Sequence, residues 1–149
     1  MITLHPTAAF SLSVKVNLSI PTGRIRDLLC GALEGGSNYW AAIKRYKIRK
    51  GLTLKDFKDG EGHMTRPDGE YWPSYLLAPF AKDCGLVIVD REGEDPKEYT
   101  LDMPAMRRGI QVMADKYPHH FSNFLTENDD ADTSDVFLQC CLFGEIVYG

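Results

Sequence analysis

The residues that could do chemistry gather first in one short segment, Glu34-Gly35-Gly36-Ser37-Asn38-Tyr39-Trp40, with Lys44 and Arg45 following shortly after. Two glycines ahead of a helix start can leave backbone N–H groups pointing at an anion. The tyrosine and tryptophan add ring faces on which a base can stack. The segment therefore fits a nucleotide-like ligand. It also fits a plain corner between two helices. The segment matches neither GxGxxG nor the Walker pattern, so no known phosphate-binding motif favours the ligand over the corner.

A second group of candidates lies in the acidic stretch Asp129-Asp130-Ala131-Asp132-Thr133-Ser134-Asp135. Clustered carboxylates can bind Mg²⁺ or Ca²⁺ or act as a paired acid and base. The same residues can simply cap the helix that follows. Capping leaves Asp135, Gln139 and Glu145 unexplained around an apolar helix, where polar groups must be satisfied or functional. We therefore keep Asp132, Asp135, Gln139 and Glu145 as candidate ligand-binding residues, and we predict no metal site and no cofactor.

The formal net charge of −4 conceals two opposed segments. Residues 44–58 hold seven basic residues and one acid, whereas residues 115–149 hold seven acids and one basic residue. The basic segment could contact phosphates or an acidic protein, could be a solvated surface, or could pair with the acidic segment of another copy. No helix-turn-helix, zinc-finger or ribonucleoprotein motif accompanies it. We therefore expect a protein or small-anion partner and a homo-oligomer rather than duplex DNA binding.

Periodicity predicts the elements that must position these residues. Strict alternation predicts a half-buried strand over 11–20, and helical spacing predicts a helix over 22–33. A second helix is expected to begin at Ser37 and to align Tyr39, Ile43 and Tyr46 on one face. The remaining predictions are a strand over 71–77 that Pro73 interrupts, a hairpin of 85–90 with 97–101, helices from Asp102, Pro118 and Val136, and a short strand over 145–148.

The order of these elements predicts an α+β fold in a single domain, 1–149, with a small antiparallel sheet and helices packed on one face. Turn residues over 59–69 predict a mobile loop there. The chain has no apolar run long enough to span a bilayer, and its N-terminus lacks the pattern of a signal peptide. We therefore expect a cytoplasmic protein with no membrane partner. Its four cysteines are expected to be reduced.

Three stretches carry a resemblance to known sequences. Residues 29–40 (LCGALEGGSNYW), 132–139 (DTSDVFLQ) and 143–149 (FGEIVYG) resemble a group of small, uncharacterised proteins of tailed bacteriophages and prophages. The resemblance spans most of the chain from Pro21 onward. It implies a phage accessory protein in the host bacterial cytoplasm, and it implies no catalytic residues and no cofactor.

Two functions from different classes follow. The first is stoichiometric binding of a host factor or a nucleotide-like ligand, in host takeover or counter-defence, without catalysis. The second is a small nucleotide- or nucleic-acid-processing enzyme that uses Glu34, Asp132, Asp135 and Glu145 as acids or metal ligands. The second requires the Gly35-Gly36 corner and the Asp132–Asp135 turn to meet around one cleft. We favour the first function because no catalytic motif accompanies the carboxylates.

Overall fold

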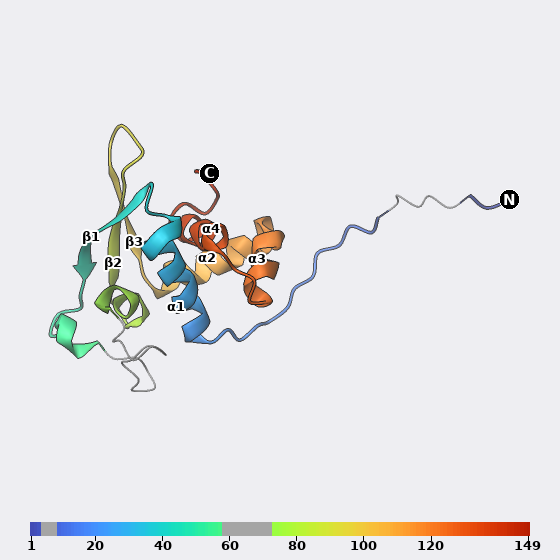
Figure 1. The fold of residues 1–149 in the computed structure, drawn as a ribbon. Coiled ribbons are helices and arrows are strands. Elements are labelled where there is room, and N and C mark those ends of the chain that lie inside the picture. The colour runs from blue at the N-terminus through green and yellow to red at the C-terminus, as the bar shows by residue number, and fades with distance from the viewer. Residues whose placement is uncertain (4–8, 58–72) are drawn as a thin grey trace.

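The sheet of the protein has three antiparallel strands. A computed structural model describes residues 1–3, 9–57 and 73–149. In the described part, β1 (Ala41–Lys47), β2 (Gly85–Asp90) and β3 (Lys97–Leu101) lie side by side in that order. The predicted hairpin of β2 and β3 is confirmed. Figure 1 shows the helices gathered on one side of this sheet. The predicted α+β class with an antiparallel sheet is therefore confirmed.

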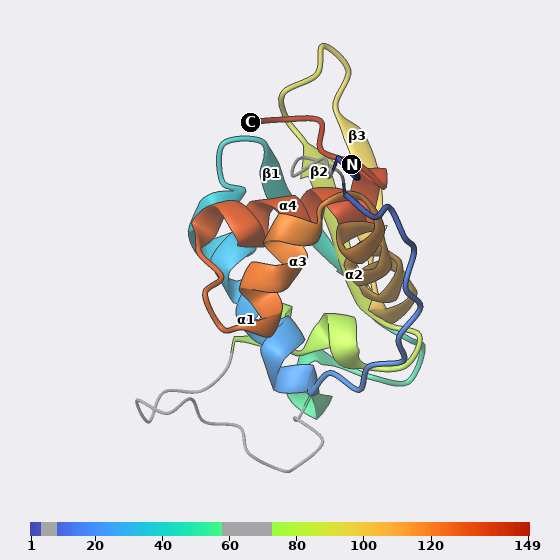
Figure 2. The ribbon, with the colours of Figure 1, turned by 90° about the vertical axis from the view of Figure 1, so that its right-hand side faces the viewer.

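The last helix forms the centre of the helical layer. It is α4 (Ala131–Phe143), and it contacts α1 (Thr22–Gly31), α2 (Met103–Lys116) and α3 (Pro118–Leu125) (Figure 2). Every residue of α4 from Thr133 to Cys141 is buried, as expected for a helix that is apolar nearly all round. It starts earlier than predicted because Asp130, not a later residue, caps it by accepting from the Thr133 N–H at 2.9 Å.

A π-helical turn, a side-chain cap and a glycine set the ends of three of the helical elements. After α1 the backbone widens into a π-helical turn, η1 (Ala32–Gly36), before it reaches the corner. The Asp102 carboxylate caps α2 by accepting from the Ala105 N–H at 3.0 Å. Gly144 ends α4 at a φ of 74°, in the left-handed region that glycine adopts without strain. Three short 3₁₀ turns complete the described elements: η2 (Leu54–Asp56), η3 (Ser74–Leu76) and η4 (Ala78–Phe80).

The predicted second helix from Ser37 is wrong, because residues 41–47 form strand β1 instead. Ile43 and Tyr46 share a face as predicted, but for a different reason. The register shifts between Ile43 and Arg45, so a β-bulge at Lys44 adds one residue to the strand. Ile43 then pairs with Ile88 and Tyr46 with Leu86, and both point toward the core. A bulged strand therefore reproduces a spacing that is typical of a helix.

Three predicted strands do not form in the described residues. Residues 11–20 form no strand and are exposed up to Ser19, because no strand among the described residues lies beside them to supply hydrogen bonds. Residues 73–77 hold the turn η3, while 71 and 72 lie outside the described residues. Residues 145–148 form no strand, since side chains bind their backbone. The predicted loop over 59–69 also lies outside the described residues.

The four cysteines are free, as predicted, and three of them are buried. Burial raises the pKa of Cys140 to about 12 and the pKa of Cys141 well above its ordinary value. These two thiols therefore stay protonated and pack as small apolar side chains. In the part of the chain that is described, no helix is long and apolar enough to cross a membrane.

Candidate functional site

The structure brings the glycine corner and the first turns of α4 together at the carboxylate of Asp135. Its Oδ1 accepts hydrogen bonds from Ser37 Oγ and from Trp40 Nε1, each at 2.7 Å. Its Oδ2 accepts from Tyr39 OH at 2.7 Å and from Gln139 Nε2 at 3.0 Å. We call these five residues the Asp135 cluster. The corner residues come from the segment before β1, and Asp135 and Gln139 lie one turn apart on α4.

The Asp135 carboxylate is buried with neutral donors alone. Asp135 is 8% exposed, and Ser37, Trp40 and Gln139 are almost fully buried. Among the described residues no lysine or arginine forms an ion pair with it. Four directed hydrogen bonds must therefore offset the loss of water around the charge, which is the usual condition for keeping a carboxylate inside a protein.

Gln139 extends the cluster to the end of the chain. Its Oε1 accepts from the backbone N–H groups of Val147 and Tyr148, both at 2.8 Å. Its Nε2 also donates to the Tyr148 carbonyl at 3.1 Å. The N–H of Ile146 is taken by Tyr117 OH at 2.8 Å. Side chains thus satisfy the backbone of residues 146–148, which explains why the predicted strand there does not form.

Aromatic rings pack over the cluster. Trp40 lies 5.0 Å from Phe143 and 5.7 Å from Tyr148 between ring centroids. Tyr148 OH donates to Asp90 Oδ2 at 2.7 Å, and this bond raises the pKa of Tyr148 to about 12. Partial burial raises the pKa of Tyr39 above its ordinary value, and the hydrogen bond to Asp135 raises it further. Both phenols therefore stay protonated at neutral pH and act as donors.

The two glycines of the corner serve packing. A Cβ on Gly36 would lie 2.3 Å from the Ala131 carbonyl oxygen, at the start of α4, whereas a Cβ on Gly35 would meet nothing within 4 Å. Neither residue has a positive φ. The N–H groups that follow them are bonded within the turn, Ser37 to the Ala32 carbonyl and Asn38 to the Gly35 carbonyl. Gly36 therefore allows the close approach that brings Ser37 to Asp135.

The other predicted site residues lie in other contacts. Lys44 and Arg45 pair with Glu98 across the sheet, at 2.5 Å and 3.0 Å, and their hydrogen bonds lower the pKa of Glu98. Glu34 accepts from Tyr75 OH and from Cys30 Sγ. Asn38 is exposed, and its carbonyl accepts from Arg91. Asp132 and Glu145 are exposed as well.

The sequence therefore predicted five residues that do meet: Ser37, Tyr39, Trp40, Asp135 and Gln139. It did not identify Asp90, Phe143 and Tyr148, which line the same region. Phe143 and Tyr148 stand in the C-terminal stretch 143–149, where their aromatic side chains are the local feature that could have pointed to them. Asp90 ends an apolar strand, and nothing local links it to a tyrosine 58 residues away.

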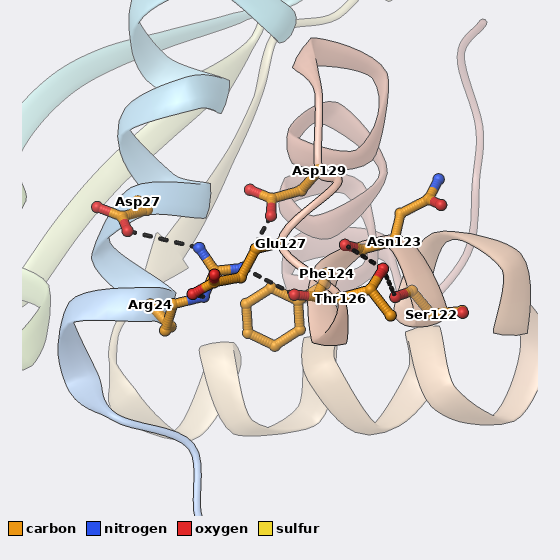
Figure 3. Close-up of polar contacts among 8 residues, drawn as sticks. All are labelled: Arg24, Asp27, Ser122, Asn123, Phe124, Thr126, Glu127 and Asp129. Atoms are coloured by element: carbon orange, nitrogen blue, oxygen red, sulfur yellow. Dashed lines mark hydrogen bonds and ion pairs between the residues drawn. The ribbon is translucent and has the colours of Figure 1, made fainter.

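Much of the acidic C-terminal segment has partners within the same molecule. Figure 3 shows the Arg24 guanidinium between Asp27, Glu127 and Asp129, with N···O distances of 3.5, 3.9 and 2.8 Å. Arg24 also donates to the Phe124 carbonyl at 2.7 Å. The Thr133 N–H lowers the pKa of Asp130, the capping residue. These contacts tie α1 to the turn between α3 and α4, and they use carboxylates that the charge pattern alone would leave for a partner.

The N-terminal residues 9–20, which we call the arm, present apolar side chains to water. Phe10, Leu12, Val14, Val16 and Leu18 alternate along it and are between 98% and 52% exposed. In Figure 1 the arm runs away from the rest of the protein as an extended chain. Single exposed apolar residues are ordinary, whereas five at alternate positions of one segment form an unusually apolar exposed stretch.

Comparisons with family models, curated proteins and solved structures add no relative to this picture. Searches of all three gave no match for the chain. Within residues 1–3, 9–57 and 73–149, no three His, Cys, Asp or Glu side chains gather closely enough to hold a metal ion. The geometry of the Asp135 cluster and of the arm is therefore the basis for the functional proposal.

Proposed function

We propose that this protein is a phage accessory protein that acts by stoichiometric binding of a host protein, and that the arm makes the contact. The observation that carries the proposal is the apolar face of the arm, with five exposed side chains on alternate residues. The phage context rests on the sequence resemblance. The mode of binding rests on the arm.

The arm has the chemistry of a segment that becomes ordered against a partner. Its apolar face gains free energy when a partner covers it, at about 25 cal/mol per Å². Its other face holds Ser11, Ser13, Lys15, Asn17 and Ser19, which can stay in water. An extended segment with two such faces suits addition to a sheet edge or insertion into an apolar groove.

The Asp135 cluster supports binding by the arm over binding of a nucleotide at the corner. Its polar groups are bonded to one another, and Trp40 is packed against Phe143 and Tyr148. A nucleotide would have to displace those contacts and leave a buried carboxylate short of donors. The enzymatic alternative also asks Glu34, Asp132 and Glu145 to act with Asp135, whereas the hydrogen bonds of Glu34 run to Tyr75 and Cys30.

The experiment is capture from a bacterial lysate by the full chain and two matched double variants. One variant carries Val14→Asp and Val16→Asp on the apolar face, and the other carries Ser13→Asp and Asn17→Asp on the polar face. Both add the same charge to the same exposed segment. We expect one host protein retained in near-equimolar amount by the wild type and the polar-face variant, and at least about tenfold less by the apolar-face variant. Equal retention by all three would contradict the proposal.

A further inference from the structure

The strand β1 combines an open sheet edge with a row of positive charge. It is the outer strand in the order β1-β2-β3, and among the described residues no strand lies on its other side (Figure 1). On that side, the backbone N–H and C=O groups of an edge strand have no partner in the sheet. They are therefore available to another extended chain.

Burial alternates along the end of β1 and just beyond it, and this alternation places three basic side chains together. Tyr46 and Ile48 pack against the core, whereas Arg45, Lys47 and Arg49 are exposed. Successive side chains of an extended chain point to opposite faces, so these three cations lie on the same face, about 7 Å apart along the chain. A strand added beside β1 would present every second side chain to them.

The acids of the same molecule leave most of this charge without a partner. Glu98 on β3 reaches across the sheet to Lys44 and Arg45. The only acid within residues 41–57, Asp56, accepts from a backbone N–H at the start of η2. Four basic residues of this range form no ion pair with any described residue, and we call them the basic edge: Lys47, Arg49, Lys50 and Lys55.

The charge of the basic edge disfavours a second copy of this chain as the partner. Pairing β1 with β1 of another molecule would bring two basic edges together, and like charges on neighbouring strands are destabilising. Many acids of a second copy are already engaged, since Asp129 and Asp130 hold the turn before α4 and Asp135 is buried. Its exposed acids between β2 and β3 lie in a bend rather than in an extended segment.

The side chains around the basic edge favour a peptide over a nucleic acid. Proteins that bind single strands stack the bases on aromatic rings beside their cations. Within residues 41–57 the exposed large apolar side chain is Leu54, whereas the rings of Tyr46 and Phe57 pack in the core. Hydrogen bonding along a sheet edge is the way in which an extended polypeptide is recognised.

We propose that the basic edge binds an extended acidic segment of a partner protein, which adds to the sheet beside β1. The added strand completes the backbone hydrogen bonds of β1, and its carboxylates at alternate positions face Lys47 and Arg49. Each exposed ion pair contributes little alone, so the backbone bonds and the charges act together. This surface is separate from the arm, and the inference does not rest on the proposed function.

The test is fluorescence anisotropy with a labelled peptide of alternating glutamate and threonine that carries five carboxylates. The full chain is compared with two folded variants that reverse equal charge: Lys47→Glu with Arg49→Glu at the basic edge, and Arg107→Glu with Arg108→Glu at exposed positions of α2. We expect the wild type and the α2 variant to bind the peptide, and the edge variant to bind at least about tenfold more weakly. Equal affinities of the two variants, or no binding by the wild type, would overturn the inference.

Hydrogen exchange distinguishes strand addition from charge attraction alone. A saturating amount of the peptide should slow exchange at alternate amides of β1 at least about tenfold, because backbone pairing protects them. Unchanged exchange of these amides in the bound state would overturn the addition of a strand to the edge.

Two further measurements test the other partners. A thymidine oligonucleotide with five phosphates should bind more weakly than the peptide, and tighter binding would overturn the inference in favour of a nucleic acid. Sedimentation of the wild type should show no association that the edge variant loses, since such a loss would assign the edge to a second copy. Both variants keep the sequence of the arm, so capture of a host protein by each of them tests the proposed function separately.

Discussion

The carboxylate of Asp135 connects three parts of the chain that are distant in sequence. It accepts from the corner before β1 and from Gln139 on its own helix, and Gln139 in turn holds the backbone of Val147 and Tyr148. Burial and the number of donors show that this cluster is satisfied. The cluster therefore holds the corner, α4 and the C-terminal residues in fixed positions relative to one another.

At the residue scale we predict that Asp135→Asn lowers the free energy of unfolding by about 2 to 3 kcal/mol. The amide keeps the shape of the carboxylate but turns one acceptor oxygen into a donor. The Trp40 indole and the Gln139 amide nitrogen can only donate, so one of them would face another N–H group. Urea unfolding followed by circular dichroism measures the change.

Asp132→Asn is the matched control for that measurement. Asp132 lies in the first turn of α4 and is exposed, so its loss affects only the interaction with the helix dipole, worth about 0.3 to 1 kcal/mol. Equal losses of stability for the two variants would show that the cluster contributes nothing beyond the helix terminus.

At the scale of elements, the contact between the corner and α4 decides which residues meet. The turn η1 passes so close to the start of α4 that no side chain fits at Gly36. The bulge in β1 then places Ile43 and Tyr46 on the covered face of the sheet. The glycine pair at the corner is thus explained by packing between elements.

We therefore predict opposite outcomes for two neighbouring substitutions. Gly36→Ala should cost about 2 kcal/mol of stability, because its Cβ would lie 2.3 Å from the Ala131 carbonyl oxygen and backbone must shift. Gly35→Ala meets open space in a helical turn and should leave stability unchanged or raise it by up to about 1 kcal/mol. Thermal unfolding of the pair checks this, and a loss at Gly35 equal to that at Gly36 would argue for a role other than packing.

At the scale of the whole molecule, the chain divides into a packed α+β body and an arm. Arg24 marks the junction, since it is held between α1 and the turn before α4 (Figure 3). Residues 9–19 are exposed, whereas Ile20 and Ile25, on either side of Arg24, pack against the core. This division leaves the apolar side chains of the arm exposed, which is the basis of the proposed contact with a host protein.

Limited digestion with trypsin should distinguish the exposed arm from the packed body of the protein. We predict cleavage after Lys15 at least about ten times faster than cleavage after Arg24, because Lys15 lies in an exposed extended segment and Arg24 lies in helix α1. The remaining fragment should keep the circular dichroism spectrum and the urea midpoint of the full chain. Mass spectrometry of the digest identifies the sites. Comparable rates at the two sites would mean that the arm packs on the body.

The sequence predicted the elements whose formation depends on local interactions. The helices after Asp102 and before Gly144, and the hairpin of residues 85–90 and 97–101, follow from caps, turns and periodicity within a few residues. It also identified five of the side chains that meet at Asp135. It failed at residues 41–47, since a bulge changes which residues share a face, and at residues 11–20, since alternation does not show whether a neighbouring strand exists.

The sequence by itself thus determined the apolar positions of segments with a regular pattern, such as the helix after Asp102 and the arm, because those positions depend only on the order of residues. Tertiary structure alone decided which faces are covered. Ser37 and Asp135 are 98 residues apart, and their hydrogen bond exists only because η1 and α4 pack together. The arm keeps its strand pattern without a strand, since the hydrogen bonds and apolar contacts that complete a strand come from elsewhere in space.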